Sequence, residues 1–212
     1  MKLILFGGAE VDQGQFLPQL KLIEQVIKRI DPKQVLHIPF ARSRVIEKEW
    51  DGDWFNENIH LDKTIYLNAK NEEDVDKANN PLIFMNGGGD NENLLNKIKE
   101  NPKLLKLVEN AEYVIGESAG AKVLGASVRK KGSDENSELM KGLNIIKNTI
   151  IEPHYTERNR HGILIKDMKE SGLPYGIGID CVTAIEFDLN EFPEKYNKIG
   201  DGLVEVKIDS IL

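Results

Sequence analysis

The chain has 212 residues, of which 40% are hydrophobic and 30% are charged, and its formal net charge is -7. This length and composition are typical of one globular domain with a well-buried core, so we expect residues 1–212 to form a single domain. The acidic balance argues against nucleic acid as a partner, because its binders cluster Lys and Arg. No apolar run approaches the roughly 18 residues of a membrane span, so we expect no membrane partner either.

The opening stretch MKLILFGGAE carries an apolar run that is too short for the core of a signal peptide. The chain contains a single cysteine, Cys181, which cannot form an internal disulfide. Both observations favour a reducing cytoplasm as the location of the protein.

Short apolar runs alternate with helix-like stretches through the first half of the chain. Leu3–Phe6 is typical of a buried strand, and Leu17–Ile30 has apolar residues at helical spacing. Further strands are expected at Val35–Phe40, Thr64–Leu67, Leu82–Met85 and Tyr113–Gly116, with two helices between the last two. Strands that are apolar throughout and alternate with helices predict an α/β protein with a parallel sheet covered on both faces.

The second half of the chain has a less regular pattern. Strands joined by turns are expected in LNIIKNTIIEPH, YGIGID, VTAIEF and GLVEVKI, with one helix near Arg160–Ser171. The charge-rich segment Arg129–Gly142 is typical of a solvated loop, and its length would also suit a lid over a site.

A serine motif follows the strand at Tyr113–Gly116. Gly116-Glu117-Ser118-Ala119-Gly120 matches G-x-S-x-G, in which a tight strand-to-helix turn projects the serine hydroxyl above the edge of a sheet. The preceding strand and the helix-compatible stretch that follows favour Ser118 as a nucleophile, with the Ala119 amide facing an oxyanion. The alternative is an ordinary serine near a helix start in a glycine-rich turn.

Gly87–Gly89 form a second glycine-rich turn, between an expected strand and an expected helix. Three glycines can bring bare N–H groups close to a ligand, whereas a plain turn capped by Asp90 or Asn91 is the simpler alternative. A phosphate loop would need a G-K-[ST] ending, which is absent. In a parallel sheet this turn and the serine turn would lie together at the carboxyl ends of strands, where ligands bind.

A candidate base is found among the four histidines. His154 follows Pro153 at the end of an expected strand and is well positioned to meet a serine across a sheet edge. The alternative for His154 is a structural role, and we expect His37 in a buried strand, His60 at the surface and His161 at a helix start. A histidine base must be neutral, so activity should rise with pH through a histidine pKa.

Taken together, these residues resemble peptidase family S51, which includes dipeptidase E and cyanophycinase. The resemblance rests on MNGGGDN, GESAGA, PHY with arginines after it and GIGIDCVTAI, in order from about Leu3 to Glu186. It implies a three-layer α/β sandwich with a mostly parallel sheet, similar to the class I glutamine amidotransferase or flavodoxin-type fold. It implies that Ser118 is the nucleophile and His154 the general base, with an oxyanion hole at the amides of Gly88 and Ala119. No metal or organic cofactor is implied.

The sequence departs from the family pattern at three positions. Glu117 replaces the Trp of dipeptidase E or the Thr of other members, and an acid there could attract a cationic group or repel an acidic substrate. Asp90 ends the glycine loop, where Asn is usual. Cys181 stands where related sequences carry the Glu that orients the histidine.

The residue that orients His154 is therefore an open question. Asp180 is the tentative choice, although neighbours on a strand point to opposite faces, and Asp134 and Glu186 are other candidates. The acid that orients the histidine in related sequences is, in this chain, at another position, replaced by a neutral partner or missing. A serine–histidine pair that lacks its acid still acts, but more slowly.

We expect a serine-type peptidase that hydrolyses short peptides through an acyl-enzyme, as a monomer or homodimer. Arg158 and Arg160 are candidates for binding a substrate carboxylate, with surface charge as the alternative. One other function is an esterase of the α/β-hydrolase type, whose histidine would lie nearer the C-terminus than His161 does. Another is a weakened or inactive family member that binds a small peptide.

Overall fold

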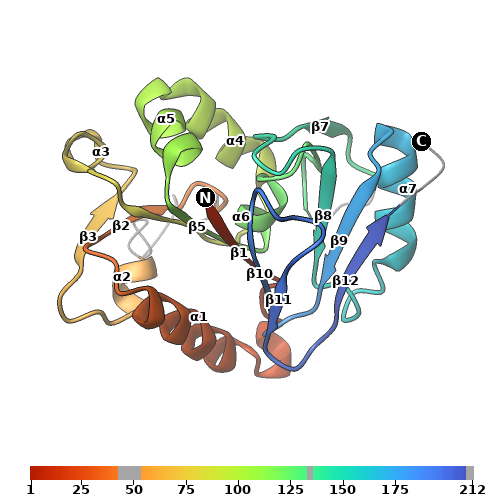
Figure 1. Ribbon diagram of the computed structural model, residues 1–212, viewed down its shortest axis with the longest axis horizontal. Helices are drawn as coiled ribbons and strands as arrows, with labels where there is room; N and C mark the ends of the chain where they lie inside the picture. Colours follow the sequence, from red (N-terminus) through yellow and green to blue (C-terminus); the bar gives the residue numbers. More distant parts are fainter. Residues whose placement is uncertain (43–53, 133–135, 209–212) are drawn as a thin grey trace.

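Two β-sheets with helices around and between them make up the fold in the computed structural model, which describes residues 1–42, 54–132 and 136–208 (Figure 1). The first sheet has seven strands in the order β11-β10-β1-β5-β4-β2-β3, and the second has five in the order β12-β9-β8-β6-β7. The strands of the first sheet are β1 (Lys2–Phe6), β2 (Gln34–Ile38), β3 (Ile65–Asn68), β4 (Leu82–Met85), β5 (Tyr113–Glu117), β10 (Ala184–Asp188) and β11 (Asn197–Ile199). The strands of the second are β6 (Ser127–Arg129), β7 (Leu139–Lys141), β8 (Thr149–Pro153), β9 (Tyr175–Ile179) and β12 (Val204–Ile208).

The strands pair in a largely parallel manner. In the first sheet β3, β2, β4, β5 and β1 run parallel, and β10 and β11 add an antiparallel edge. In the second sheet β6, β8 and β9 are parallel, whereas β7 and β12 are antiparallel to their neighbours. The expected α/β class with a largely parallel sheet is confirmed. The second sheet is not predicted by the sequence, because an apolar run indicates an extended segment without naming its partner.

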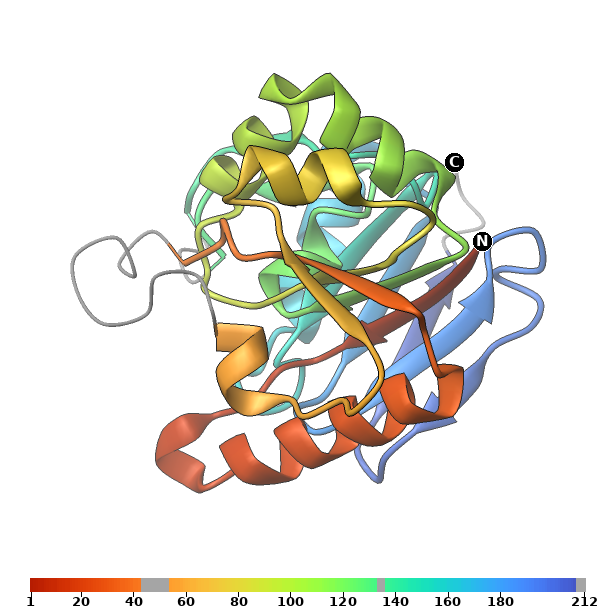
Figure 2. The same ribbon diagram turned by 90° about the vertical axis from the view of Figure 1, so that its left-hand side faces the viewer.

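The helices cover both faces of the first sheet, as Figure 2 shows. They are α1 (Phe16–Ile30), α2 (Trp54–Asn58), α3 (Glu72–Lys77), α4 (Asn91–Glu100), α5 (Pro102–Asn110), α6 (Ala119–Lys122) and α7 (His161–Ser171), with a 3-10 turn at Val11–Gln13. Side chains alternate along β1, so Leu3 and Leu5 pack with α4 and α5 while Ile4 and Phe6 pack with α1. Among the described residues, no helix is both long and apolar enough to cross a membrane.

The segment Arg129–Gly142 is more ordered at its ends than the expected solvated loop. Its ends form the β6–β7 hairpin, and Arg129 is buried with its guanidinium on the carboxylate of Asp167. Residues 133–135, including Asp134, lie outside the described part of the chain.

Helix α6 lies between the two sheets and packs closely on β4. A Cβ atom at Gly120 would lie only 2.1 Å from the carbonyl oxygen of Met85, far inside van der Waals contact. Glycine is thus required at position 120, because the backbones of α6 and β4 approach each other closely there.

We predict that Gly120→Ala lowers the free energy of unfolding by about 1–3 kcal/mol, because the added methyl group overpacks this contact. The matched control is Gly162→Ala in α7, where a Cβ atom would meet nothing within 4 Å. There alanine should be neutral or stabilising by up to about 1 kcal/mol. Urea unfolding of both variants measures the difference, and equal midpoints would contradict the packing argument.

Candidate active site

Ser118 lies at the junction between β5 and α6, in a strained backbone conformation. Its φ of 51° and ψ of -108° are rare for a residue with a side chain, a kind of strain that costs roughly 1–3 kcal/mol. The Ser118 N–H donates to the carbonyl oxygen of Phe6 at 3.0 Å, which ties the turn to β1. The predicted strand–turn–helix setting of the G-x-S-x-G motif is confirmed.

His154 reaches Ser118 from the end of β8, in the second sheet. Its Nε2 atom lies 3.0 Å from the Ser118 Oγ atom, and its side chain is buried. The His154 backbone also has a positive φ, of 52°, and its N–H donates to the carbonyl oxygen of Gly7. The geometry is that of a hydroxyl whose proton can pass to an imidazole.

The other histidines lie away from Ser118. His37 is fully buried in β2, as expected, and His60 is exposed, also as expected. His161 begins α7 as predicted, and its ring packs on Tyr155 with the ring centroids 4.1 Å apart.

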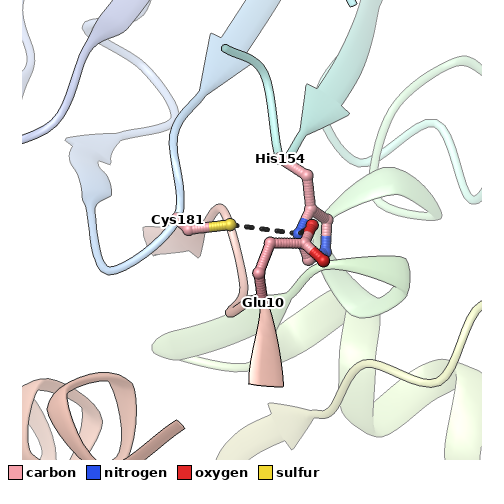
Figure 3. A group of neighbouring side chains, drawn as sticks. All are labelled: Glu10, His154 and Cys181. Atoms are coloured by element: carbon pink, nitrogen blue, oxygen red, sulfur yellow. Dashed lines mark hydrogen bonds and ion pairs between the residues drawn. The ribbon is translucent and has the colours of Figure 1, made fainter. Parts of the chain in front are cut away.

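Two groups meet the other nitrogen of the His154 ring (Figure 3). The Glu10 Oε1 atom lies 2.8 Å from His154 Nδ1, and the Cys181 Sγ atom lies 3.1 Å from it. Glu10 belongs to the loop that follows β1. Sequence reasoning missed this residue. The sequence offered one signal for Glu10. It is an acidic residue just beyond the carboxyl end of β1, and β1 pairs with β5, the strand that precedes Ser118.

Asp180, the tentative choice for the orienting role, uses its carboxylate for other contacts in the structure. Its carboxylate instead accepts the N–H of Thr156 at 3.0 Å and the N–H of Leu203 at 2.8 Å. Asp180 therefore holds two backbone segments of the second sheet together. Glu186, another candidate, forms an ion pair with Arg29 at 2.7 Å.

The glycine turn after β4 faces the serine turn. A Cβ atom at Gly88, whose φ is +155°, would lie 2.4 Å from the carbonyl oxygen of Ala41, so only glycine fits. The Gly87 N–H donates to Glu117 Oε2 at 2.6 Å, which couples the two turns directly. Within the described part of the chain, the N–H groups of Gly88 and Ala119 have no hydrogen-bond acceptor. Both residues line a cleft of about 310 Å³ that is also lined by Ser118 and His154.

The cleft is lined mainly by polar and glycine residues. Its lining is Ala9, Arg42, Gly87, Gly88, Gly89, Asn91, Glu117, Ser118, Ala119, Lys122, Gly132, Pro153, His154, Arg158 and Arg160. A larger cavity of about 690 Å³ lies beside α4 and α5, but neither Ser118 nor His154 lines it. Chemistry, rather than size, therefore identifies the candidate site.

The two arginines after His154 are both paired with carboxylates. Arg160 Nη1 lies 2.5 Å from Glu152 Oε1, which also accepts from Lys122 Nζ at 2.7 Å. All three side chains are buried, so Arg160 is not the surface charge that the sequence left open. Arg158 is exposed and donates to both carboxylate oxygens of Glu10, at 2.5 and 3.1 Å. Lys122 was not predicted, and burial lowers its pKa although Glu152 opposes this.

Burial and charge set the protonation states around the ring. Burial, aided by the positive charge of Arg158 and opposed by Glu10, lowers the pKa of His154 to about 4. The hydrogen bond from Arg158 lowers the pKa of Glu10. At neutral pH the imidazole is thus neutral and the carboxylate ionised, which is the state a general base requires. Burial raises the pKa of the Cys181 thiol well above its ordinary value, so the thiol keeps its proton.

Comparison with known proteins decides the family. Residues 3–193 match the sequence profile of peptidase family S51. This chain belongs to peptidase family S51. The resemblance carried by the glycine turn, the serine turn and the PHY motif is therefore confirmed, and with it the class of serine peptidases.

Named relatives share about a third of their residues with this chain, over part of its length. The cyanophycinase of Geminocystis herdmanii (strain PCC 6308) is 32% identical over 145 residues, covering 64% of this chain and 51% of the relative. The cyanophycinase of Synechococcus elongatus is 32% identical over 116 residues, covering 50% of this chain and 36% of the relative. The aligned region thus spans about half or less of the length of these relatives.

Solved structures share the fold of this family S51 member. A peptidase from an acI-B1 Actinobacterium superposes with a TM-score of 0.59 at 23% identity, over 98% of this chain and 90% of the other. A putative peptidase E from Listeria monocytogenes EGD-e gives a TM-score of 0.58 at 19% identity, over 99% and 98% of the two chains.

The lowered pKa of His154 changes the expected pH dependence. We predict that kcat/KM for peptide hydrolysis rises with pH through an apparent pKa of about 4, because only the neutral ring accepts a proton. Arg158→Ala should move this rise to higher pH, since it removes a positive charge that disfavours the imidazolium and leaves Glu10 to favour it.

The control for this prediction is Lys166→Ala, which removes an exposed lysine that is paired with Glu170. It should leave the profile unchanged. Two results would contradict this account of the charges around His154. One is a rise of wild-type kcat/KM near the ordinary pKa of histidine, and the other is an Arg158→Ala profile that does not shift from that of wild type.

Proposed function

We propose that this member of family S51 hydrolyses short peptides by nucleophilic catalysis at Ser118. The observation that carries the proposal is the chain of contacts from Ser118 Oγ to His154 Nε2 and from His154 Nδ1 to Glu10 Oε1, at 3.0 and 2.8 Å. In this proposal Ser118 attacks the peptide carbonyl while His154 takes its proton. His154 then returns the proton to the leaving amine, and an acyl-enzyme remains for water to hydrolyse.

The proposed oxyanion hole consists of the Gly88 and Ala119 amides. Support comes from their place in the same cleft as Ser118 and from the absence of another acceptor for them among the described residues. Glu117 assists indirectly in this proposal, because its carboxylate holds Gly87 and thereby the turn that presents Gly88.

Glu10 is the proposed orienting acid, in place of Asp180. An ionised carboxylate on Nδ1 fixes the tautomer that leaves Nε2 free to accept, and it stabilises the imidazolium that forms. With a carboxylate already on this nitrogen, the cysteine at position 181 is no sign of a missing acid. The inactive peptide-binding alternative therefore gains no support, and the esterase alternative lacks the family relationship.

The charges of the cleft favour an acidic group on the substrate. Its described lining contains four basic side chains, Arg42, Lys122, Arg158 and Arg160, and one acidic side chain, Glu117. Burial raises the pKa of Glu117, which weakens the repulsion of acidic substrates that the sequence suggested. We propose short peptides with a carboxylate close to the scissile bond, and the family relationship supports the peptide class.

The remaining features of the proposal concern the whole molecule. We propose that residues 1–212 act as one domain with the three-layer architecture of class I glutamine amidotransferases, which the family relationship supports. The protein is proposed to act as a monomer or homodimer without a required cofactor. A cytoplasmic location is proposed from the single free cysteine.

Removal of the nucleophile tests the central step. We predict that Ser118→Ala abolishes labelling by a fluorophosphonate probe and lowers kcat for peptide hydrolysis on the order of 10³-fold or more. Unchanged circular dichroism is the control for folding. A variant that keeps near-full activity would remove Ser118 from the mechanism.

The orienting acid has its own test. We predict that Glu10→Gln lowers kcat on the order of 10²–10⁴-fold, whereas Asp180→Asn leaves kcat within a few-fold of wild type in the folded fraction. The two variants are matched because each replaces a carboxylate by its isosteric amide. Full activity in Glu10→Gln together with loss in a folded Asp180→Asn would return the orienting role to Asp180.

A further inference from the structure

We propose that Glu10, His154 and Cys181 form a site for a zinc-like divalent cation, and that an ion bound there stops peptide hydrolysis. The binding itself follows from the three side chains alone. The inhibitory consequence rests on the function proposed above, in which His154 is the base.

The three donor atoms are already gathered in one place. One donor atom from each of Glu10, His154 and Cys181 lies within 4.8 Å of the other two. Zinc binds such atoms at about 2.0–2.3 Å, which puts the ligands of a tetrahedral ion roughly 3.4–3.6 Å apart. The carboxylate and thiol lie 2.8 and 3.1 Å from the ring nitrogen, so each needs to retreat by only about 0.3–0.8 Å by that tetrahedral estimate.

The chemistry of the donors favours zinc over calcium or magnesium. An imidazole, a thiol that can ionise and a carboxylate are the three ligand types of zinc sites, whereas the alkaline-earth ions prefer oxygen alone. Three protein ligands leave a fourth position open to water.

The surroundings of Cys181 add negative charge to this site. Glu157 accepts the Cys181 N–H on Oε1 at 3.0 Å. Its Oε2 atom is buried and has no hydrogen-bond partner among the described residues. Arg158 opposes a cation because it is bonded to Glu10, so the ion must displace or share that contact.

An ion can approach the cluster from two sides. His154 lines the catalytic cleft, and Cys181 lines a separate cavity of about 420 Å³ beside α1. Glu10 itself is part-exposed in the loop after β1. His154 and Cys181 are themselves buried, so the ion would reach them from these two cavities rather than from the open surface.

Binding would change the tautomer of His154. A neutral imidazole carries one proton, and the catalytic state needs it on Nδ1 so that Nε2 can accept from Ser118. A metal ion bound at Nδ1 takes the place of the proton there, so the ring proton moves to Nε2. Nε2 can then no longer accept the proton of Ser118, and the base is lost. The Cys181 thiol loses its proton to solvent as the metal–sulfur bond forms, and one proton is released for each ion bound.

The direct test uses Co²⁺ as a spectroscopic probe of the purified full chain. Cys181 is the one cysteine of the sequence, so a thiolate-to-cobalt charge-transfer band can arise only from this residue. We expect the band in wild type, its loss in Cys181→Ser, and displacement of Co²⁺ by Zn²⁺. Zn²⁺ affinity by calorimetry should fall at least 10–100-fold in Cys181→Ser and in Glu10→Gln.

Further measurements separate this proposal from the proposed function. Ser118→Ala should keep the Co²⁺ band although it is inactive, because Ser118 is not a ligand. In Cys181→Ser, Zn²⁺ should inhibit peptide hydrolysis much more weakly than in wild type, while a chelator restores wild-type activity. Absence of the band, or equal Zn²⁺ affinity in wild type and Cys181→Ser, would overturn the site. An inactive wild type that still shows the band would overturn the peptidase proposal alone.

Discussion

The hydrogen bond between Ser118 and His154 connects two β-sheets, and the candidate site depends on how those sheets are held together. Ser118 directly follows strand β5 of the first sheet, and His154 directly follows strand β8 of the second. Helix α6 fills the space between them, and its buried side chains join Leu3, Leu5 and Ile151 in one apolar cluster. Close packing of this kind transmits small displacements, so the 3.0 Å contact reflects the docking of both sheets.

Charge is distributed around the cleft in two separate groups. Glu10 is shared between His154 and Arg158, while Glu152 is shared between Lys122 and Arg160. Buried ions are costly unless they are paired, and Glu152 pairs with two buried basic groups. Glu10 pairs with one cation, Arg158, and with the neutral ring of His154. The lining of the cleft nevertheless contains more basic than acidic side chains, in contrast to the acidic balance of the whole chain.

Local features of the site could be predicted from the sequence, and long-range ones could not. The serine turn and the glycine turn can each be predicted from a few consecutive residues. Their glycines are required locally, where the backbone is strained or another backbone comes close. His154 was inferred from its place at a strand end. Glu10 could not be found in this way, since its contact with His154 depends on β1 lying beside β5 and on the second sheet docking against both. The contacts of Asp180 with Thr156 and Leu203 could not be predicted for the same reason, because strand pairing sets them.

The order of these segments along the chain has a consequence for biosynthesis. Glu10 and Ser118 leave the ribosome before His154, and the loop that carries Asp180 and Cys181 is fixed only when Leu203 accompanies β12. A growing chain therefore carries Ser118 before it contains His154, the base of the proposed mechanism. If Ser118 acts as proposed, its base is in place only once the second sheet has docked against the first, because His154 belongs to the second sheet.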